Sequence, residues 1–152
     1  MFRRFRSYGL ILFLLSLLLA CESGEPIGPF STTPEISQLK LSQDSLIEFI
    51  DSLYLEFSYE DGNGDIGFSS PNQKSLSVKD SRLEEADLYH IPPLADEELF
   101  VHIQGQLQVN LGKLFLLSND EEEKIVFTVK LRDREGNWSE EVQSDTLLLL
   151  RQ

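Results

Sequence analysis

Apolar and polar residues alternate along much of the chain after residue 35. The longest run covers 101–111, where Val101, Ile103, Leu107, Val109 and Leu111 are separated by polar residues. The same period of two recurs over 53–60 and 125–131. Successive side chains of a strand point to opposite faces, so this period is typical of a strand with one face on a core and the other in water. The pattern predicts three long, half-buried strands.

Shorter apolar runs predict further strands between turns rich in Gly, Pro, Asn and Asp. They cover 36–41, 76–78, 88–91, 114–117 and 142–150. A helical turn is predicted only over 81–88, and Pro92-Pro93 prevents a helix from continuing there. Strands do not alternate with helices in this pattern, which indicates an all-β, antiparallel two-sheet sandwich of about seven to nine strands.

Two further features bear on this sandwich. Gly105 lies on the apolar face of the longest predicted strand, where a missing side chain indicates a bulge or the close approach of another backbone. The acidic run over 119–123 predicts a solvated hairpin loop that could bind cations loosely. Neither feature changes the predicted fold class.

The first twenty-one residues have a different pattern. Arg3, Arg4 and Arg6 precede an apolar run over 9–20 that ends at Cys21. This run is shorter than the roughly 20 residues that a membrane-spanning helix needs, which predicts a signal peptide over 1–20 that is cleaved. The sequence around Cys21 resembles the bacterial lipobox, and the resemblance implies that the Cys21 thiol carries lipid. The alternative is a plain secretory leader or an uncleaved anchor, with Cys21 incidental.

A stretch rich in Gly, Pro and hydroxyl groups follows Cys21 and predicts a flexible tether over 21–35, which leaves 36–152 as one domain. Without residues 1–20, ten basic residues face twenty-six acidic ones, a formal charge of −16. Such a surface repels nucleic acid and favours divalent cations or basic partners, although solubility alone also explains it. Because lipid would occupy the only thiol, no disulfide is expected.

The loop over 59–68 carries a candidate metal site. Asp61, Asn63 and Asp65 alternate with glycines, and hard cations such as Ca²⁺ require several oxygen ligands around one point. The loop is not an EF-hand, since Ile66 stands where glycine is required and Asn72 where a glutamate is required. The alternative is a turn without a metal, because Asp-Gly and Asn-Gly are strong hairpin signals.

A second loop, over 131–139, predicts a tight turn. Its Asp133 carboxylate can cap backbone amides, and Asn137 can adopt a left-handed conformation. Trp138, the only tryptophan, is predicted to pack in the core at the end of the sandwich, with an exposed aromatic contact as the alternative.

Together the lipobox, the Asp-Gly-Asn-Gly-Asp-Ile-Gly segment and the closing motif 133–139 resemble small lipoproteins of Bacteroidota-type bacteria. Glu22 and Glu25, just after the lipobox cysteine, resemble their export tag, and the alternative is a solvated linker with no role in sorting. The closing motif is also similar to a turn of bacterial immunoglobulin-like and fibronectin-like modules. The resemblance implies an immunoglobulin-like sandwich held on the outer membrane, on its periplasmic or cell-surface face. It implies little about chemistry.

The chain has few residues that could form a catalytic site. The two histidines, His90 and His102, lie on or beside predicted strands, and a catalytic triad or zinc site would have to be built around one of them. We therefore expect a non-catalytic envelope lipoprotein that acts as a binding or accessory module. Its expected contacts are the membrane, through lipid on Cys21, and a protein or glycan partner, with no nucleic acid. The alternative is a hydrolase of envelope or extracellular polymers.

Overall fold

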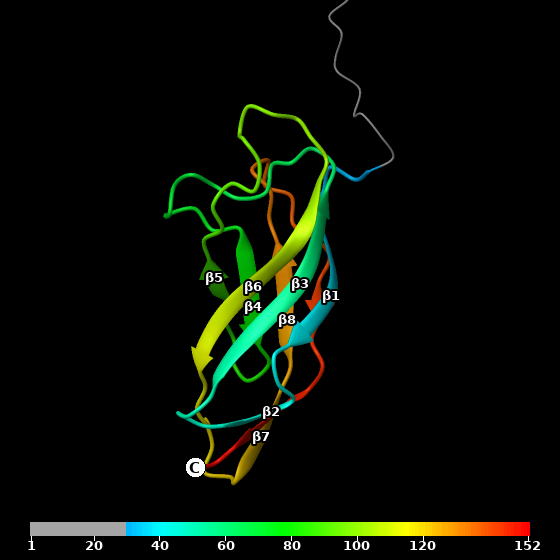
Figure 1. Cartoon of the computed structure of the whole chain (residues 1–152). Coiled ribbons are helices and arrows are strands. Elements are labelled where there is room, and N and C mark those ends of the chain that lie inside the picture. Colours follow the sequence, from blue (N-terminus) through cyan, green and yellow to red (C-terminus); the bar gives the residue numbers. More distant parts are fainter. Residues whose placement is uncertain (1–29) are drawn as a thin grey trace, which may run out of the picture.

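The computed structural model describes residues 30–152, which form ten β-strands and no helix (Figure 1). The strands are β1 (Glu35–Leu41), β2 (Ser45–Ile47), β3 (Ser52–Asp61), β4 (Leu76–Asp80), β5 (Asp87–Tyr89), β6 (Ile103–Lys113), β7 (Glu122–Ile125), β8 (Phe127–Leu131), β9 (Val142–Gln143) and β10 (Leu147–Leu150). The all-β prediction is confirmed. Cys21, the predicted signal peptide and most of the predicted tether lie outside the described residues.

The ten strands form three sheets rather than the predicted two. Their strand orders are β1-β3-β6, β5-β4-β8-β9 and β2-β10-β7. Every pair is antiparallel except β10 with β2, which is parallel over three residues. A parallel pair requires a long connection between its strands, and nearly the whole domain lies between β2 and β10. The prediction of a wholly antiparallel arrangement is wrong at this pair.

Two of the three alternating segments form the longest strands, β3 and β6, and supply much of the core. The third, predicted as one strand over 125–131, is divided at Val126 between β7 and β8, which belong to different sheets. In β3, Leu53, Leu55 and Phe57 are fully buried, and the residues between them are more exposed. β3 pairs with β6 along its whole length, with one bulge where Leu53 faces Gly112 and Tyr54 faces Asn110. The inward side chains of all three sheets join one hydrophobic cluster. β6 begins at Ile103 rather than at the predicted Val101, which is exposed.

Three further sequence predictions differ from the observed backbone. Residues 114–117 form no strand. In place of the helical turn predicted over 81–88, residues 81–86 form a turn and an irregular segment, and the last two residues belong to β5. The predicted strand over 142–150 is divided into β9 and β10. At Ser144, just after β9, the backbone amide donates to the Phe127 carbonyl and the side-chain hydroxyl accepts the Phe127 amide, where a regular strand pair would use the backbone carbonyl.

Gly105 is explained by an aromatic neighbour. It lies opposite Tyr59 in the β3–β6 pair, and a Cβ added to it would lie 2.7 Å from the Tyr59 hydroxyl. The predicted close approach is therefore present, but it is made by a side chain rather than by a backbone, and the bulge lies elsewhere in the strand.

The domain has two distinct ends (Figure 1). The described chain begins at Phe30 beside the β3–β4 and β5–β6 loops, and we call this the loop end. The Ser31 carbonyl already bonds to the Gly62 amide there, at 2.7 Å. The β2–β3, β4–β5 and β6–β7 connections and the C-terminus lie at the opposite, far end. Within residues 30–152, no helix is long and apolar enough to cross a membrane.

Candidate functional site

The three predicted metal ligands lie together at the loop end. Asp61 ends β3, and the chain then turns through Asn63 and Asp65 before it crosses to the sheet that contains β4. These side chains belong to residues that are 0%, 4% and 8% exposed. The Asp65 amide donates to Asp61 Oδ2 at 2.9 Å. The loop is thus a buried crossing between two sheets rather than a hairpin.

Glycines make this compact crossing possible. Gly64 and Gly67 have φ values of +74° and +89°, in the left-handed region that disfavours other residues. A Cβ on Gly64 would lie 2.4 Å from the Val101 carbonyl oxygen. The glycines of the motif therefore let the β5–β6 loop close over the acidic residues.

The second motif packs directly against the first. Ile66 and Asp133 form an isolated β-bridge, and the Arg134 amide donates to the Asp65 carbonyl at 3.0 Å. The Arg134 guanidinium donates to the carbonyls of Gly67 and Gly64 at 3.2 and 3.3 Å. The fold therefore brings together the two loops that the sequence singled out separately.

Burial and mutual repulsion disturb the carboxyl groups of this site. Burial raises the pKa of Asp61 to about 6, backbone hydrogen bonds from Asp65 and Gly64 oppose the rise, and the negative charges of Asp65 and Asp133 add to it. Burial also raises the pKa of Asp65, and the charge of Asp133 adds to that rise. These two carboxyl groups are therefore harder to ionise than exposed ones, and the charge of Arg134 offsets the rise at Asp65 only in part.

Three oxygens in the loop lack hydrogen-bond partners among the described residues. They are Oδ1 of Asp61, Oδ1 of Asn63 and Oδ1 of Asp65, and all three are buried. An unsatisfied buried polar group costs about 1–3 kcal/mol, and a charged one more. The predicted ligand set thus coincides with the unsatisfied side-chain oxygens of this loop. Residues 30–152 contain no group of three or more His, Cys, Asp or Glu side chains placed to hold a metal; this set is two carboxylates and an amide.

The closing turn follows its prediction in part. Asp133 Oδ1 accepts the Asn137 amide at 2.7 Å, and Oδ2 accepts the Asn137 side-chain amide at 2.8 Å. The predicted cap is therefore confirmed. The left-handed residue, however, is Gly136, with φ +98°, and not Asn137.

Trp138 does not fill the core. It is 37% exposed, and Lys130 and Arg132 each place their charged group 5.8 Å from its ring centroid. The prediction of core packing is wrong, because the bridge between Arg132 and Trp138 keeps the ring on the surface beside these cations.

The histidines occupy separate places with separate partners. His102 Nε2 lies 3.1 Å from Glu60 Oε1, and its ring stacks on Phe30 at 3.8 Å. His90 Nδ1 lies 3.1 Å from the Gln73 carbonyl oxygen. The structure does not bring them together.

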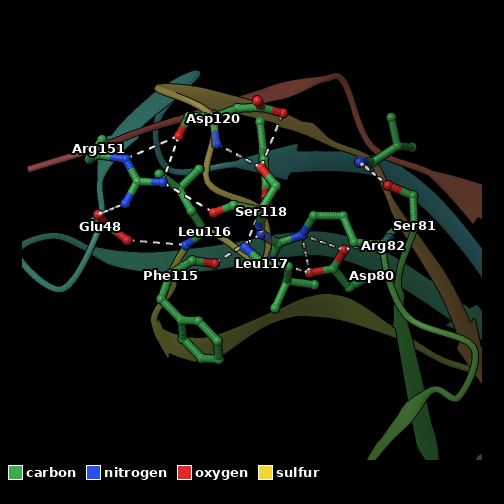
Figure 2. Close-up of polar contacts among 12 residues, drawn as sticks. Glu48, Asp80, Ser81, Arg82, Phe115, Leu116, Leu117, Ser118, Asp120 and Arg151 are labelled. Carbon is green, nitrogen blue, oxygen red and sulfur yellow. Dashed lines mark hydrogen bonds and ion pairs between the residues drawn. The ribbon is translucent and has the colours of Figure 1, made fainter.

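The far end holds an arrangement that sequence reasoning missed. The connection after β6 lacks the predicted strand, and side chains bind its backbone instead (Figure 2). Arg82 donates to the Phe115 carbonyl at 2.9 Å, and Glu48 accepts the Leu116 amide at 3.2 Å. Arg151 donates to the Ser118 and Asp120 carbonyls. These bonds fix the segment without strand pairing.

Arg82 is the centre of this network. Its guanidinium pairs with Asp80 at 2.7 Å and with Glu123 at 2.6 Å, and all three side chains are at most 14% exposed. Burial raises the pKa of Glu123, but hydrogen bonds from Arg82, Ser118 and Leu117 outweigh it and lower the pKa to about 2. The predicted solvated hairpin over 119–123 is confirmed only in part: residues 119–122 are exposed, but Glu122 and Glu123 begin β7, and β6 and β7 belong to different sheets, so the connection is not a hairpin.

The fixed segment exposes apolar side chains. Phe49 and Phe115 stack with ring centroids 5.9 Å apart. Phe115, Leu83 and Leu117 line a hollow of about 230 Å³. We call Phe49, Leu83, Phe115 and Leu117 the apolar platform; each residue is 44–56% exposed. Figure 2 shows the Phe115 ring pointing away from the polar network.

The backbone at Phe49 is strained. Its φ of +59° costs a residue with a side chain about 1–2 kcal/mol, and the ring gains little burial in return. Strain of this kind, held in place by surrounding structure, is common at functional sites. The sequence gives one indication of the platform, the run of four apolar residues over 114–117. Such a run is also what a buried strand looks like, so it does not by itself predict exposed side chains.

Comparison with known proteins adds no family to these observations. No protein-family model matches the chain, and neither the curated proteins nor the solved structures gave a match.

Proposed function

We propose that the protein is a non-catalytic lipoprotein of the bacterial envelope, held on the outer membrane by lipid on Cys21, whose domain binds a partner protein through the apolar platform. The observation that carries this proposal is the stacked, exposed pair of Phe49 and Phe115 on a rigidly held backbone. Exposed apolar clusters on soluble domains typically mark interaction sites, and aromatic anchors supply much of the binding energy at protein interfaces.

The position of the platform favours a protein partner over the bilayer. The described chain begins at the loop end (Figure 1), so an anchor at Cys21 would join the domain there, whereas the platform residues belong to the β2–β3, β4–β5 and β6–β7 connections of the far end. An acidic domain is also repelled by anionic headgroups. The membrane and the partner would therefore meet opposite ends of the domain.

We further propose that the two larger sheets, β1-β3-β6 and β5-β4-β8-β9, pack as an immunoglobulin-like sandwich, with the small third sheet at the far end. The shared core cluster supports this arrangement, since it contains inward residues of both sheets. An experimental structure in which these sheets do not face each other would contradict it.

Site-specific photo-cross-linking tests the binding proposal. The full-length chain would carry a photo-reactive phenylalanine analogue at position 115, or at position 100 as a matched control. Phe100 is 56% exposed, close to the 51% of Phe115, but it belongs to the loop end. We expect one or two discrete protein adducts from position 115 in the native cells and none from position 100. No adduct from position 115, or the same adducts from both positions, would refute the platform as the binding surface.

A further inference from the structure

We propose that the loop over 61–65 binds one calcium ion through the side-chain oxygens of Asp61, Asn63 and Asp65. The site lies at the loop end, away from the apolar platform, and it does not depend on the function proposed for that platform. The loop spacing and the unsatisfied oxygens are separate observations, and both point to the same three residues.

The closing turn shows what a satisfied version of this loop looks like. In both loops an aspartate accepts the amide of the residue four positions later, Asp61 from Asp65 and Asp133 from Asn137. The side chain of Asn137 then donates to the second oxygen of Asp133. Asp65 carries a carboxylate, which when ionised has no hydrogen to donate. Oδ1 of Asp61 and Oδ1 of Asp65 therefore remain unsatisfied among the described residues.

The charge of Arg134 acts on this loop and lowers the pKa of Asp65, but burial and the charge of Asp133 outweigh it. The hydrogen bonds of its guanidinium go to the carbonyls of Gly64 and Gly67, and none to the carboxylates is present among the described residues. Asp133 adds a third negative charge that acts on both Asp61 and Asp65. A bound cation would neutralise this charge, whereas a water molecule can donate hydrogen bonds to two of these oxygens but is neutral and would leave the repulsion in place.

The chemistry of the donors selects calcium. All three are oxygens, which excludes the nitrogen and sulfur sets that zinc prefers. Calcium accepts six to eight oxygen ligands in irregular geometry, with backbone carbonyls and water completing the shell, whereas magnesium requires a near-ideal octahedron. A glycine-rich loop with oxygen-bearing side chains at alternate positions suits the irregular geometry that calcium accepts.

The first test uses the Asp65→Asn substitution. The melting temperature of the full-length chain in detergent would be followed by circular dichroism, with calcium and then with excess chelator. We expect calcium to raise the melting temperature and the chelator to reverse the rise. In Asp65→Asn the rise should be clearly smaller at the same calcium concentration, while the variant without calcium should be at least as stable as the wild type, because its new amide can donate to Asp61 as Asn137 does to Asp133. Asp145→Asn removes an equal charge at an exposed site and should keep the calcium response.

The second test uses Asn63→Asp, which adds a carboxylate to the proposed ligand set. Affinity in such loops rises with ligand charge, so we expect calorimetry to show one calcium ion per chain, bound about tenfold more tightly by this variant than by the wild type. Any of three results would overturn the proposal: no calcium binding up to about 10 mM, an undiminished response in Asp65→Asn, or no gain of affinity in Asn63→Asp. The limit of about 10 mM is well above the dissociation constants of weak extracellular calcium modules.

Discussion

Replacing Arg82 with methionine should destabilise the domain strongly at neutral pH. Methionine keeps much of the length and apolar contact of the arginine stem but has no positive charge. The substitution leaves Asp80 and Glu123 facing each other without a cation, and it removes the donor to the Phe115 carbonyl. One change therefore tests whether the network of the far end is structurally important.

The expected loss follows from burial. Removing one member of a buried ion pair costs about 3–5 kcal/mol, because the remaining charge stays desolvated and unpaired. A solvent-exposed pair contributes about 1 kcal/mol or less. The side chains of Arg82, Asp80 and Glu123 are 14%, 9% and 12% exposed. Because these groups keep some contact with solvent, the expected loss lies at the lower limit of the range for buried pairs. We expect a loss of about 3 kcal/mol in the free energy of unfolding at pH 7.

Urea denaturation followed by circular dichroism would measure this loss across pH. The pKa of Glu123 is lowered to about 2 from an ordinary value of 4.5. A carboxyl group of this kind stabilises the fold above its ordinary pKa and loses that contribution as pH falls towards its lowered value. The difference between wild type and Arg82→Met should therefore shrink from pH 4.5 downward. A loss below about 1 kcal/mol at pH 7 would refute the assignment of a buried pair.

Two further substitutions test other parts of the structure by chemical denaturation. Gly67→Ala and Gly112→Ala both place a side chain at positive φ, but a new Cβ at Gly67 would lie 2.2 Å from the Pro92 carbonyl oxygen, whereas at Gly112 it meets no described atom within 4 Å. Gly67→Ala should therefore cost about 1–3 kcal/mol more than Gly112→Ala, and equal losses would contradict the close packing of the loop end. Trp138→Ala should lower the free energy of unfolding by less than about 1 kcal/mol, as expected of an exposed cation–π contact. A loss of about 3–5 kcal/mol would instead support the core position predicted from sequence.

The strands that bury one face were predictable because alternation records burial directly. β3, β6 and β8 each follow the period of two to within about two residues of their observed ends. Burial does not, however, determine how strands combine into sheets. β2, which pairs in parallel with β10, has only three residues, too few to carry a recognisable period. The third sheet could not be predicted for this reason.

The apolar platform could not be predicted because its residues are far apart in sequence and its support is polar. Residues 114–117 are all apolar, and such a run is normally a buried strand. It is held outside any strand by Glu48, Arg82 and Arg151, which come from three distant segments. No local pattern links these residues, so only the tertiary structure shows which apolar side chains remain exposed.

The acidic loop differs from the platform in this respect, since spacing alone singled out Asp61, Asn63 and Asp65, the residues whose buried oxygens lack hydrogen-bond partners among the described residues. What spacing could not show is why two loops of similar composition have different properties. Both use an aspartate to cap an amide four residues later, and the outcome depends on whether that later residue carries an amide or a carboxylate. Asn137 satisfies its partner, whereas Asp65 adds a second buried negative charge. The carboxylate of Asp65 therefore makes this loop less stable than the closing turn when no cation is bound. The calcium ion proposed above would offset this cost.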